Sequence, residues 1–348
     1  MNSTEIIKKI TNHNYCFQND VLKNPYRILT EENGKKVAYI FSCPIYSFDN
    51  YELVSSAWST LDTTKYAQGI NSSIFYSDKK IVLENFLGRS EITFSNNYLV
   101  EPTTNGIVLT GEESDLNFKL TTQSAYSIKN TPTALAFMIE KHLPFLTITP
   151  SPAASQNGDI TPTFIEHIKQ TENEYYIHIF SQSPCQKISV EINLYLPKLI
   201  FDTTIETKYP KQNNVYGSYA LLGESNSFGE QFLLLRPNTS NDTFSKLEKI
   251  EKAELFIPKL GGNNALICAH EILHGWCTFN TNFETRPAVA SEFSVLKEHN
   301  GYLAANITEL LKNKNFGLML ENHNKHALCA ISTGDSYEHP IIIKVQYN

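Results

Sequence analysis

The sequence predicts an all-β protein built from two antiparallel β-sandwich domains, with a few short helices. Three observations lead to this prediction. Short apolar runs recur between Asn, Asp, Gly and Ser residues, a spacing typical of strands joined by tight turns. The 20 Phe and 18 Tyr residues favour strands, because aromatic side chains fit a pleated, half-buried surface. At 348 residues, the chain also exceeds the size at which one core usually stops growing, which favours two domains.

The first domain is expected over residues 1–197, as an N-terminal β-rich domain. Residues 3–10 can form a short helix with a Ser or Thr cap. Residues 133–142 can form another helix, whereas residues 149–162 are rich in Pro, Ser and Gly and are expected to be a loop or linker. The other apolar runs predict strands, the last two as a pair. These strands are expected at residues 36–41, 73–76, 80–83, 91–94, 106–109, 174–180 and 187–194.

The second domain is expected over residues 198–348, where six motifs follow one another. They are FDTTIETKYPKQNNVYGSYALLG at 201–223, KIEKAELFI at 249–257, Trp276 ahead of TFN at 278–280 and Pro287, NITELL at 306–311, NFGLML at 315–320, and PIIIKVQY at 340–347. In this order they resemble the DNRLRE (disaggregatase-related) domain family of bacterial surface proteins. The resemblance implies a jelly-roll-like β-sandwich for this half.

The resemblance also implies a role. Modules of this family occur in bacterial surface and secreted proteins, are non-catalytic, and in some cases bind polysaccharides. The chain departs from the family at several positions. Asn306 stands where the family usually has Asp, Phe279 stands where it has Trp, and the Arg that commonly precedes residues 232–235 is missing. A metal-binding role of that Asp is therefore not carried over.

The stretch HEILH, from His270 to His274, matches the zinc-metallopeptidase pattern H-E-x-x-H. On a helix, the two His residues would share a face and bind zinc, while Glu271 activates the metal-bound water. Glu292, 18 positions after His274, is the candidate third ligand. The resemblance instead places the stretch on a strand that runs toward Trp276, which sends His270 and Glu271 to opposite faces. We therefore predict a strand. A catalytic zinc site and a non-catalytic surface metal at His270, His274 and Glu292 are the alternatives.

Other residues could bind ligands. Tyr216, Tyr219 and Trp276, with Phe228, can offer flat faces to a sugar ring, although aromatic residues of a sandwich more often lie in its core. Asp202, Asp242 and Asp335 lie near turn residues. There they could supply oxygen ligands to Ca²⁺ as a cofactor, or cap turns.

Composition excludes several partners. The formal net charge is −7 and no block of Lys and Arg occurs, so neither nucleic acid nor an anionic membrane is expected as a partner. No apolar run approaches the length of a membrane span, and the first twenty residues do not read as a signal peptide. The six cysteines contain no C-x-x-C pair, so buried free thiols are expected, with late disulfide cross-linking of an assembly as the alternative.

The expected function is that of a non-catalytic bacterial surface or structural module, adhesive or self-assembling, whose partner is polysaccharide or copies of itself. A homo-oligomer is consistent with this role. The first alternative is a spore-layer or filament subunit that polymerises through exposed strand edges, which also agrees with the lack of a signal peptide. The second alternative is a zinc metallopeptidase that uses HEILH.

Overall fold

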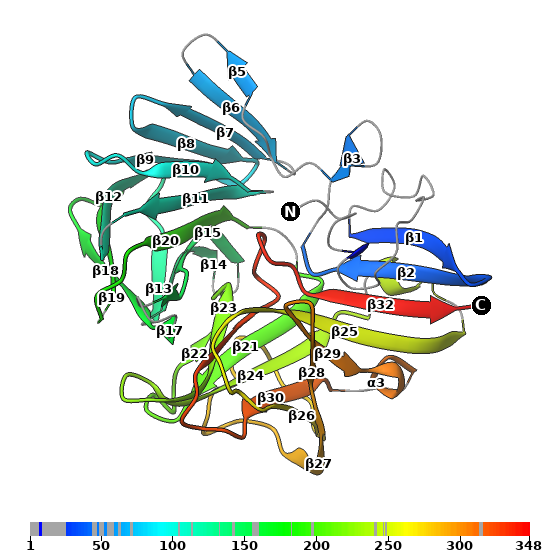
Figure 1. The fold of residues 1–348 in the computed structure, drawn as a ribbon. Coiled ribbons are helices and arrows are strands. Elements are labelled where there is room, and N and C mark those ends of the chain that lie inside the picture. The colour runs from blue at the N-terminus through cyan, green and yellow to red at the C-terminus, as the bar shows by residue number, and fades with distance from the viewer. Residues whose placement is uncertain are drawn as a thin grey trace. The chain divides into compact units, whose positions relative to one another are not determined.

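In the computed structural model, the chain divides into two compact units. Residues 55–197 form the central unit, and residues 1–54 together with 198–348 form the split unit. Among the described residues, the regular structure of both units is almost entirely antiparallel strand (Figure 1), which confirms the predicted all-β class. The structure describes residues 7–8, 26–43, 47–48, 52–53, 59–61, 64–69, 72–103, 105–112, 114–131, 133–140, 143–154, 160–181, 183–195, 198–239, 242–245, 247, 249–312 and 316–348.

The central unit is a sandwich of two sheets. The eight-stranded sheet has the order β18 (Thr163–Lys169), β19 (Glu174–Ser181), β12 (Asp115–Thr122), β9 (Gly88–Thr93), β8 (Lys80–Asn85), β7 (Ser72–Ser77), β6 (Thr64–Gly69) and β5 (Ser59–Leu61). The six-stranded sheet has the order β10 (Leu99–Pro102), β11 (Gly106–Gly111), β20 (Ile188–Leu194), β15 (Leu143–Pro150), β14 (Ala134–Glu140) and β13 (Ser127–Thr131). Side chains of both sheets, such as Phe118 and Phe137, pack into one buried core.

The helix predicted at residues 133–142 is wrong. The apolar part of this segment is β14, which pairs with β13 on one side and β15 on the other. A continuous apolar run looks the same in a buried helix and in a central strand, so periodicity alone does not separate them. Hydrogen bonding on both edges and burial of Leu135 and Phe137 outweigh the helix propensity of Ala, Leu and Met.

Two other predictions for this half are corrected. Residues 149–162 do not act as a linker, because β15 extends to Pro150 and β16 (Ala153–Ala154) pairs with β17 (Ile160–Thr161) within the central unit. Strands β19 and β20 form as predicted but do not pair with each other, since β19 joins one sheet and β20 the other. The segment between them therefore crosses from sheet to sheet.

The boundary expected after residue 197 separates the two units, but residues 1–54 belong to the split unit and not to the first domain as expected. A hairpin of β1 (Arg27–Glu32) and β2 (Lys35–Phe41) belongs to the split unit, where β2 pairs with the last strand, β32 (Ile342–Tyr347). Its turn contains Asn33 and Gly34, both with positive φ, as a tight hairpin requires. The central unit is thus inserted between two segments that form one sheet.

The rest of the split unit continues this sheet. After β32 the order is β25 (Ile250–Gly261), β31 (Cys329–Ser332), β23 (Tyr219–Ser225), β24 (Gly229–Pro237), β30 (Leu318–Asn322), β26 (Ile267–Ile272) and β27 (Val289–Val295). Strand β21 (Ile200–Glu206) pairs with β24 and β22 (Asn213–Asn214), and β29 (Tyr302–Asn306) pairs with β25 and β28 (Lys297–His299). Ala38 of β2 and Ala269 of β26 share one buried core, so the sheet folds over on itself into two layers.

Helices are few and short in the described part of the chain. They include α2 (Asp242–Ser245) and α3 (Thr308–Lys312). Of the helix predicted at residues 3–10, only Ile7 and Lys8 are described, and they are helical. No helix in the described ranges is both long and apolar enough to span a membrane.

Candidate functional site

HEILH begins on a strand, as predicted, but leaves it after Ile272. Its first three residues end β26, which pairs with β30 on one side and β27 on the other. The sequence alternates along this strand, so Ile267 and Ala269 enter the main core of the split unit, while His270 belongs to the opposite face. His274 lies beyond the end of β26 and is exposed. The helix on which a zinc metallopeptidase would place these two His residues is therefore not formed.

His270 has other partners than those predicted. Its Nε2 lies 2.8 Å from Oε1 of Glu321, and Nε2 of His323 lies 2.8 Å from the same oxygen. Glu321 is on β30 opposite Cys268, one diagonal step from His270, and His323 follows directly after β30. Pairing of β26 with β30 therefore brings to His270 two side chains, Glu321 and His323, that are 51 or more positions away in sequence.

Strand β27 completes the surroundings of this cluster. Nδ1 of His270 donates to the carbonyl oxygen of Ala290 at 3.0 Å. The Phe293 ring makes an edge contact with the His323 ring at 4.6 Å between centroids and lies 5.5 Å from the His270 ring. His270 is almost fully buried, whereas Glu321 and His323 are partly open to solvent. The cluster is thus buried at His270, while Glu321 and His323 form its accessible rim.

The predicted metal ligands His274 and Glu292 are not part of the cluster. Glu292 neighbours Phe293 on β27, so strand alternation sends it to the other face. One feature of the sequence could have indicated part of the cluster. Glu321 and His323 are two positions apart, a spacing that places both side chains on the same face of a strand. That they meet His270 could be known only from the pairing of β30 with β26.

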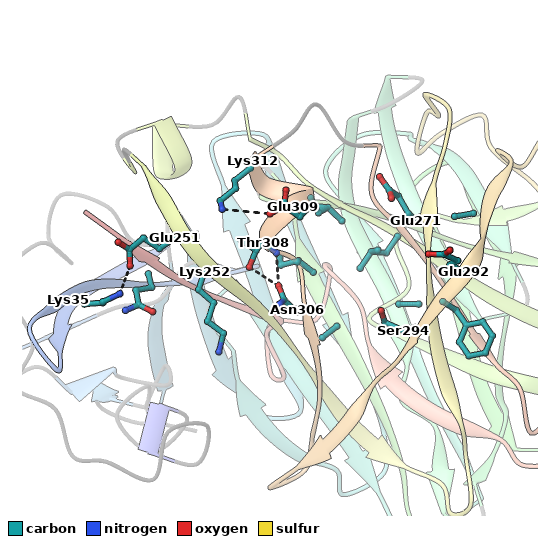
Figure 2. A pocket seen from close by; sticks show the side chains of 18 residues that line it. Lys35, Glu251, Lys252, Glu271, Glu292, Ser294, Asn306, Thr308, Glu309 and Lys312 are labelled. Carbon is teal, nitrogen blue, oxygen red and sulfur yellow. Dashed lines mark hydrogen bonds and ion pairs between the residues drawn. The ribbon is translucent and has the colours of Figure 1, made fainter.

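The other face of β26 and β27 borders a groove of about 1040 Å³ (Figure 2). Glu271 and Glu292 line it from these two strands. Asn306 lines it before α3, where its Oδ1 accepts the N–H of Thr308 at 2.9 Å. An ion pair of Lys35 with Glu251 lies at the end of the groove far from Glu271 (Figure 2). The groove is therefore rich in groups that can donate or accept hydrogen bonds.

The predicted sugar-binding aromatic residues are buried. Tyr216, Tyr219 and Phe228 are at most 5% exposed, and Trp276 is 9% exposed. The indole Nε1 of Trp276 donates to the carbonyl oxygen of Phe316 at 2.5 Å. A stacking platform needs an open ring face, so these residues act as core residues and the predicted role is corrected.

The predicted Ca²⁺ ligands Asp202 and Asp335 do come together, but around a lysine. Nζ of Lys198 lies 3.4 Å from Asp202 and 2.7 Å from Asp335, and it donates to the carbonyl oxygen of Val215 at 2.6 Å. Burial raises the pKa of Asp335 to about 7, although Lys198 opposes this shift. Burial alone would lower the pKa of Lys198, but the two carboxylates outweigh it and raise that pKa. The ammonium group thus holds the place that a cation would need, and the side chain of Asp242 lies outside the described residues.

The cysteines agree in part with the prediction of buried thiols. Cys43, Cys268 and Cys329 are buried, Cys185 is half-buried, and Cys277 is exposed. Cys16 lies outside the described residues.

No protein-family model matches this sequence, and a search of curated proteins finds no match. The resemblance to the DNRLRE family therefore stays a prediction that rests on the six motifs.

Proposed function

We propose that the chain is a non-catalytic structural module of a bacterial surface or spore layer, and that it assembles with copies of itself by pairing at strand β27. The observation that carries this proposal is the open outer edge of β27. This strand ends the sheet of the split unit, and β26 is its only strand neighbour among the described residues. Such an edge is a template for another strand.

The backbone of β27 offers groups for pairing. Leu296 donates its N–H to the carbonyl oxygen of Ile267, and hydrogen-bonded pairs alternate along an antiparallel ladder. In this register the N–H and C=O groups of Phe293 and Val295 point away from β26, toward the open edge. Their side chains are 48% and 46% exposed, so pairing would also cover apolar surface.

Strand β27 lacks the usual protection of an edge. Natural edge strands are commonly short or carry Lys or Pro, which discourage pairing. The seven residues of β27, VASEFSV, contain no Lys or Pro and one charge, Glu292. By contrast, the edge strand β18 of the central unit, TFIEHIK, carries Glu166 and Lys169. Self-pairing is therefore favoured at β27 over β18.

The test is the mass of the chain in solution by light scattering and sedimentation across the micromolar range. We expect the wild-type chain to self-associate and Val295→Lys to shift it toward monomer, because a charge is placed on the edge. Val295→Pro should do the same by removing an outward N–H without breaking a bond to β26. Ile168→Lys on β18 is the matched control, since Ile168 is 61% exposed on the other edge strand, and it should leave the mass unchanged. A wild-type chain that stays monomeric rejects the proposal.

A second candidate is polysaccharide binding in the groove between β26–β27 and α3. The supporting observation is its lining of carboxylate, amide and hydroxyl groups, including Glu271, Ser294 and Asn306, which can pair with sugar hydroxyls. Retention on insoluble cellulose, chitin or peptidoglycan tests this. Ser294→Arg would obstruct the groove and should abolish retention, whereas Val295→Lys should not. Equal retention of the wild type and Ser294→Arg would exclude the groove as the site.

A further inference from the structure

We propose that His270, Glu321 and His323 form a binding site for a divalent transition-metal ion, with Zn²⁺ as the ion that fits best. This site is separate from the proposed pairing of β27 and uses a different set of ligands from the one that HEILH suggests. Three features support it, namely the hydrogen positions on His270, the convergence of the donor atoms, and the chemistry of the set.

The hydrogen positions on His270 follow from its partners. A carbonyl oxygen only accepts, so the contact with Ala290 requires that Nδ1 of His270 carries a hydrogen. In a neutral imidazole, Nε2 then presents a lone pair, and it faces a carboxylate oxygen of Glu321 at 2.8 Å. Two lone pairs at this distance require a positive centre between them, either an added proton or a metal ion.

The contact with Ala290 is also the arrangement expected of a metal ligand. A metal-bound His usually donates its second ring N–H to a carbonyl or carboxylate, which sets the tautomer and the orientation of the ring. Here the carbonyl oxygen of Ala290 on β27 does this from the buried side, so Nε2 of His270 is aimed at Glu321 before any ion binds. Burial of His270 keeps this ring orientation rigid.

The three donor atoms converge. Nε2 of His270, one carboxylate oxygen of Glu321 and one ring nitrogen of His323 all lie within 4.8 Å of one another. In a tetrahedral zinc site, ligand atoms are about 3.3 Å apart, so side-chain rotations that open each 2.8 Å contact by roughly half an ångström would admit the ion. Glu321 and His323 lie on the accessible rim, where such rotations are least hindered.

The composition of the set selects the class of ion. Two imidazoles and one carboxylate suit Zn²⁺ and neighbouring transition metals, whereas Ca²⁺ and Mg²⁺ prefer oxygen ligands throughout. Three protein ligands leave a coordination position for water on the solvent side. Because the ligands come from β26 and the end of β30, and Ala290 comes from β27, a bound ion would tie this corner of the sheet together.

The experiment measures metal binding by the full chain after removal of metals with chelator. Zinc titration calorimetry gives stoichiometry and affinity, and Co²⁺ substitution gives a visible absorption band if the site is tetrahedral. We expect one equivalent in the wild type and at least about tenfold weaker binding in His323→Gln and in Glu321→Gln. His274→Gln is the matched control, because His274 is exposed and belongs to HEILH but not to the cluster, and it should bind like the wild type.

Each outcome decides between the interpretations. No binding by the wild type, or equal binding by the wild type, His323→Gln and Glu321→Gln, overturns the proposal. Loss of binding in His274→Gln would instead indicate that the ion is bound by the metallopeptidase ligand set of His270, His274 and Glu292. The metal-free variants are first compared with the wild type by near-ultraviolet circular dichroism, and the two rim variants provide independent tests if one folds poorly. Mass in solution, measured in parallel, reports on β27 pairing and does not depend on these ligands.

Discussion

Nζ of Lys198 lies 2.7 Å from Oδ2 of Asp335, and both side chains are almost fully withdrawn from solvent. Asp202, at 3.4 Å, shares the same ammonium group and is more deeply buried. Lys198 therefore pairs with two carboxyl groups that lie 137 and 4 positions away in sequence. Removing one charged partner of a buried cluster leaves the other charge buried and unpaired. This lowers the free energy of unfolding far more than the loss of an exposed ion pair does.

Replacement of Lys198 should accordingly be among the most destabilising changes in the split unit. We expect Lys198→Met to lower the free energy of unfolding by about 3–5 kcal/mol, because Asp202 and Asp335 would remain buried without their cation. The measurement is urea unfolding followed by the emission of Trp276 in a Trp58→Phe background, since these are the two tryptophans of the chain.

The control for this change is an exposed ion pair. Lys35→Met removes the partner of Glu251, where Lys35 is half exposed, and should change stability only slightly. A Lys198→Met variant that unfolds at nearly the same urea concentration as the Lys35→Met variant would mean that water reaches the cluster.

Glu206 should make the stability of the split unit depend on pH. Burial raises the pKa of Glu206 to about 7 from an ordinary 4.5, although the amide of Gln231, which donates to it at 2.7 Å, opposes the shift. The folded state therefore holds a proton that the unfolded state releases between pH 4.5 and 7. Stability contributed by the neutral carboxyl is present below pH 4.5 and is lost as pH rises through about 7.

Glu206→Gln isolates this contribution, because the amide stays neutral at every pH. We expect it to match the wild type at pH 4.5 and to exceed it above pH 7 by up to about 3 kcal/mol. Asp335 titrates in the same range but is common to both proteins, so it cancels in the difference. Glu224→Gln, at an exposed position of β23, is the control and should leave the pH profile unchanged. A constant difference between wild type and Glu206→Gln at all pH values would contradict the assignment.

Gly317 should tolerate no side chain. It has a φ of +103°, and a β-carbon there would collide with the carbonyl oxygen of Leu235. Its own carbonyl oxygen accepts the N–H of Ile272 at 3.0 Å, so a shift would disturb the pairing of β30 with β26. We expect Gly317→Ala to cost at least about 3 kcal/mol in urea unfolding. Gly34→Ala, which has positive φ but open space, should cost only about 1 kcal/mol, and equal losses would refute the steric argument.

Thiol labelling should separate Cys277 from Cys329. Cys277 is exposed, whereas Cys329 is fully buried. Burial also raises the pKa of Cys329 to about 11, so at pH 8 its reactive thiolate would be only about one part in a thousand. We expect iodoacetamide to modify Cys277 in the native chain and Cys329 only after unfolding, as read by peptide mass spectrometry. Early labelling of Cys329 would indicate that β31 opens readily.

Strand positions could be predicted where the sequence alternates. The run at residues 80–83 lies on a strand whose burial alternates, because one face is buried and the other is open to solvent. The run at residues 36–41 is buried almost throughout, and its strand could be predicted because it follows the turn residues Asn33 and Gly34. The segment at 133–142 was assigned wrongly because β14 is buried on both faces and shows no alternation. In such a run a buried helix and a strand that is buried on both faces look alike in the sequence.

The candidate site could be predicted only in part. HEILH drew attention to His270, but its predicted partners His274 and Glu292 lie elsewhere, since one is beyond β26 and the other is on the opposite face of β27. Glu321 and His323 come from β30, and nothing near His270 in sequence identifies β30 as its neighbour. The aromatic residues chosen for sugar binding were misjudged because composition does not reveal which rings are covered.

The sequence by itself determined that this chain is all-β and where many of its strands lie. These properties depend on propensity and alternation, which act over a few neighbouring residues. Only the tertiary structure decided that the hairpin of β1 and β2 pairs with the last strand, that Lys198 meets Asp335, and that His270 meets Glu321 and His323. Strand pairing depends on contacts between residues far apart in the chain, and many pairings satisfy the same local pattern until one of them buries a common core.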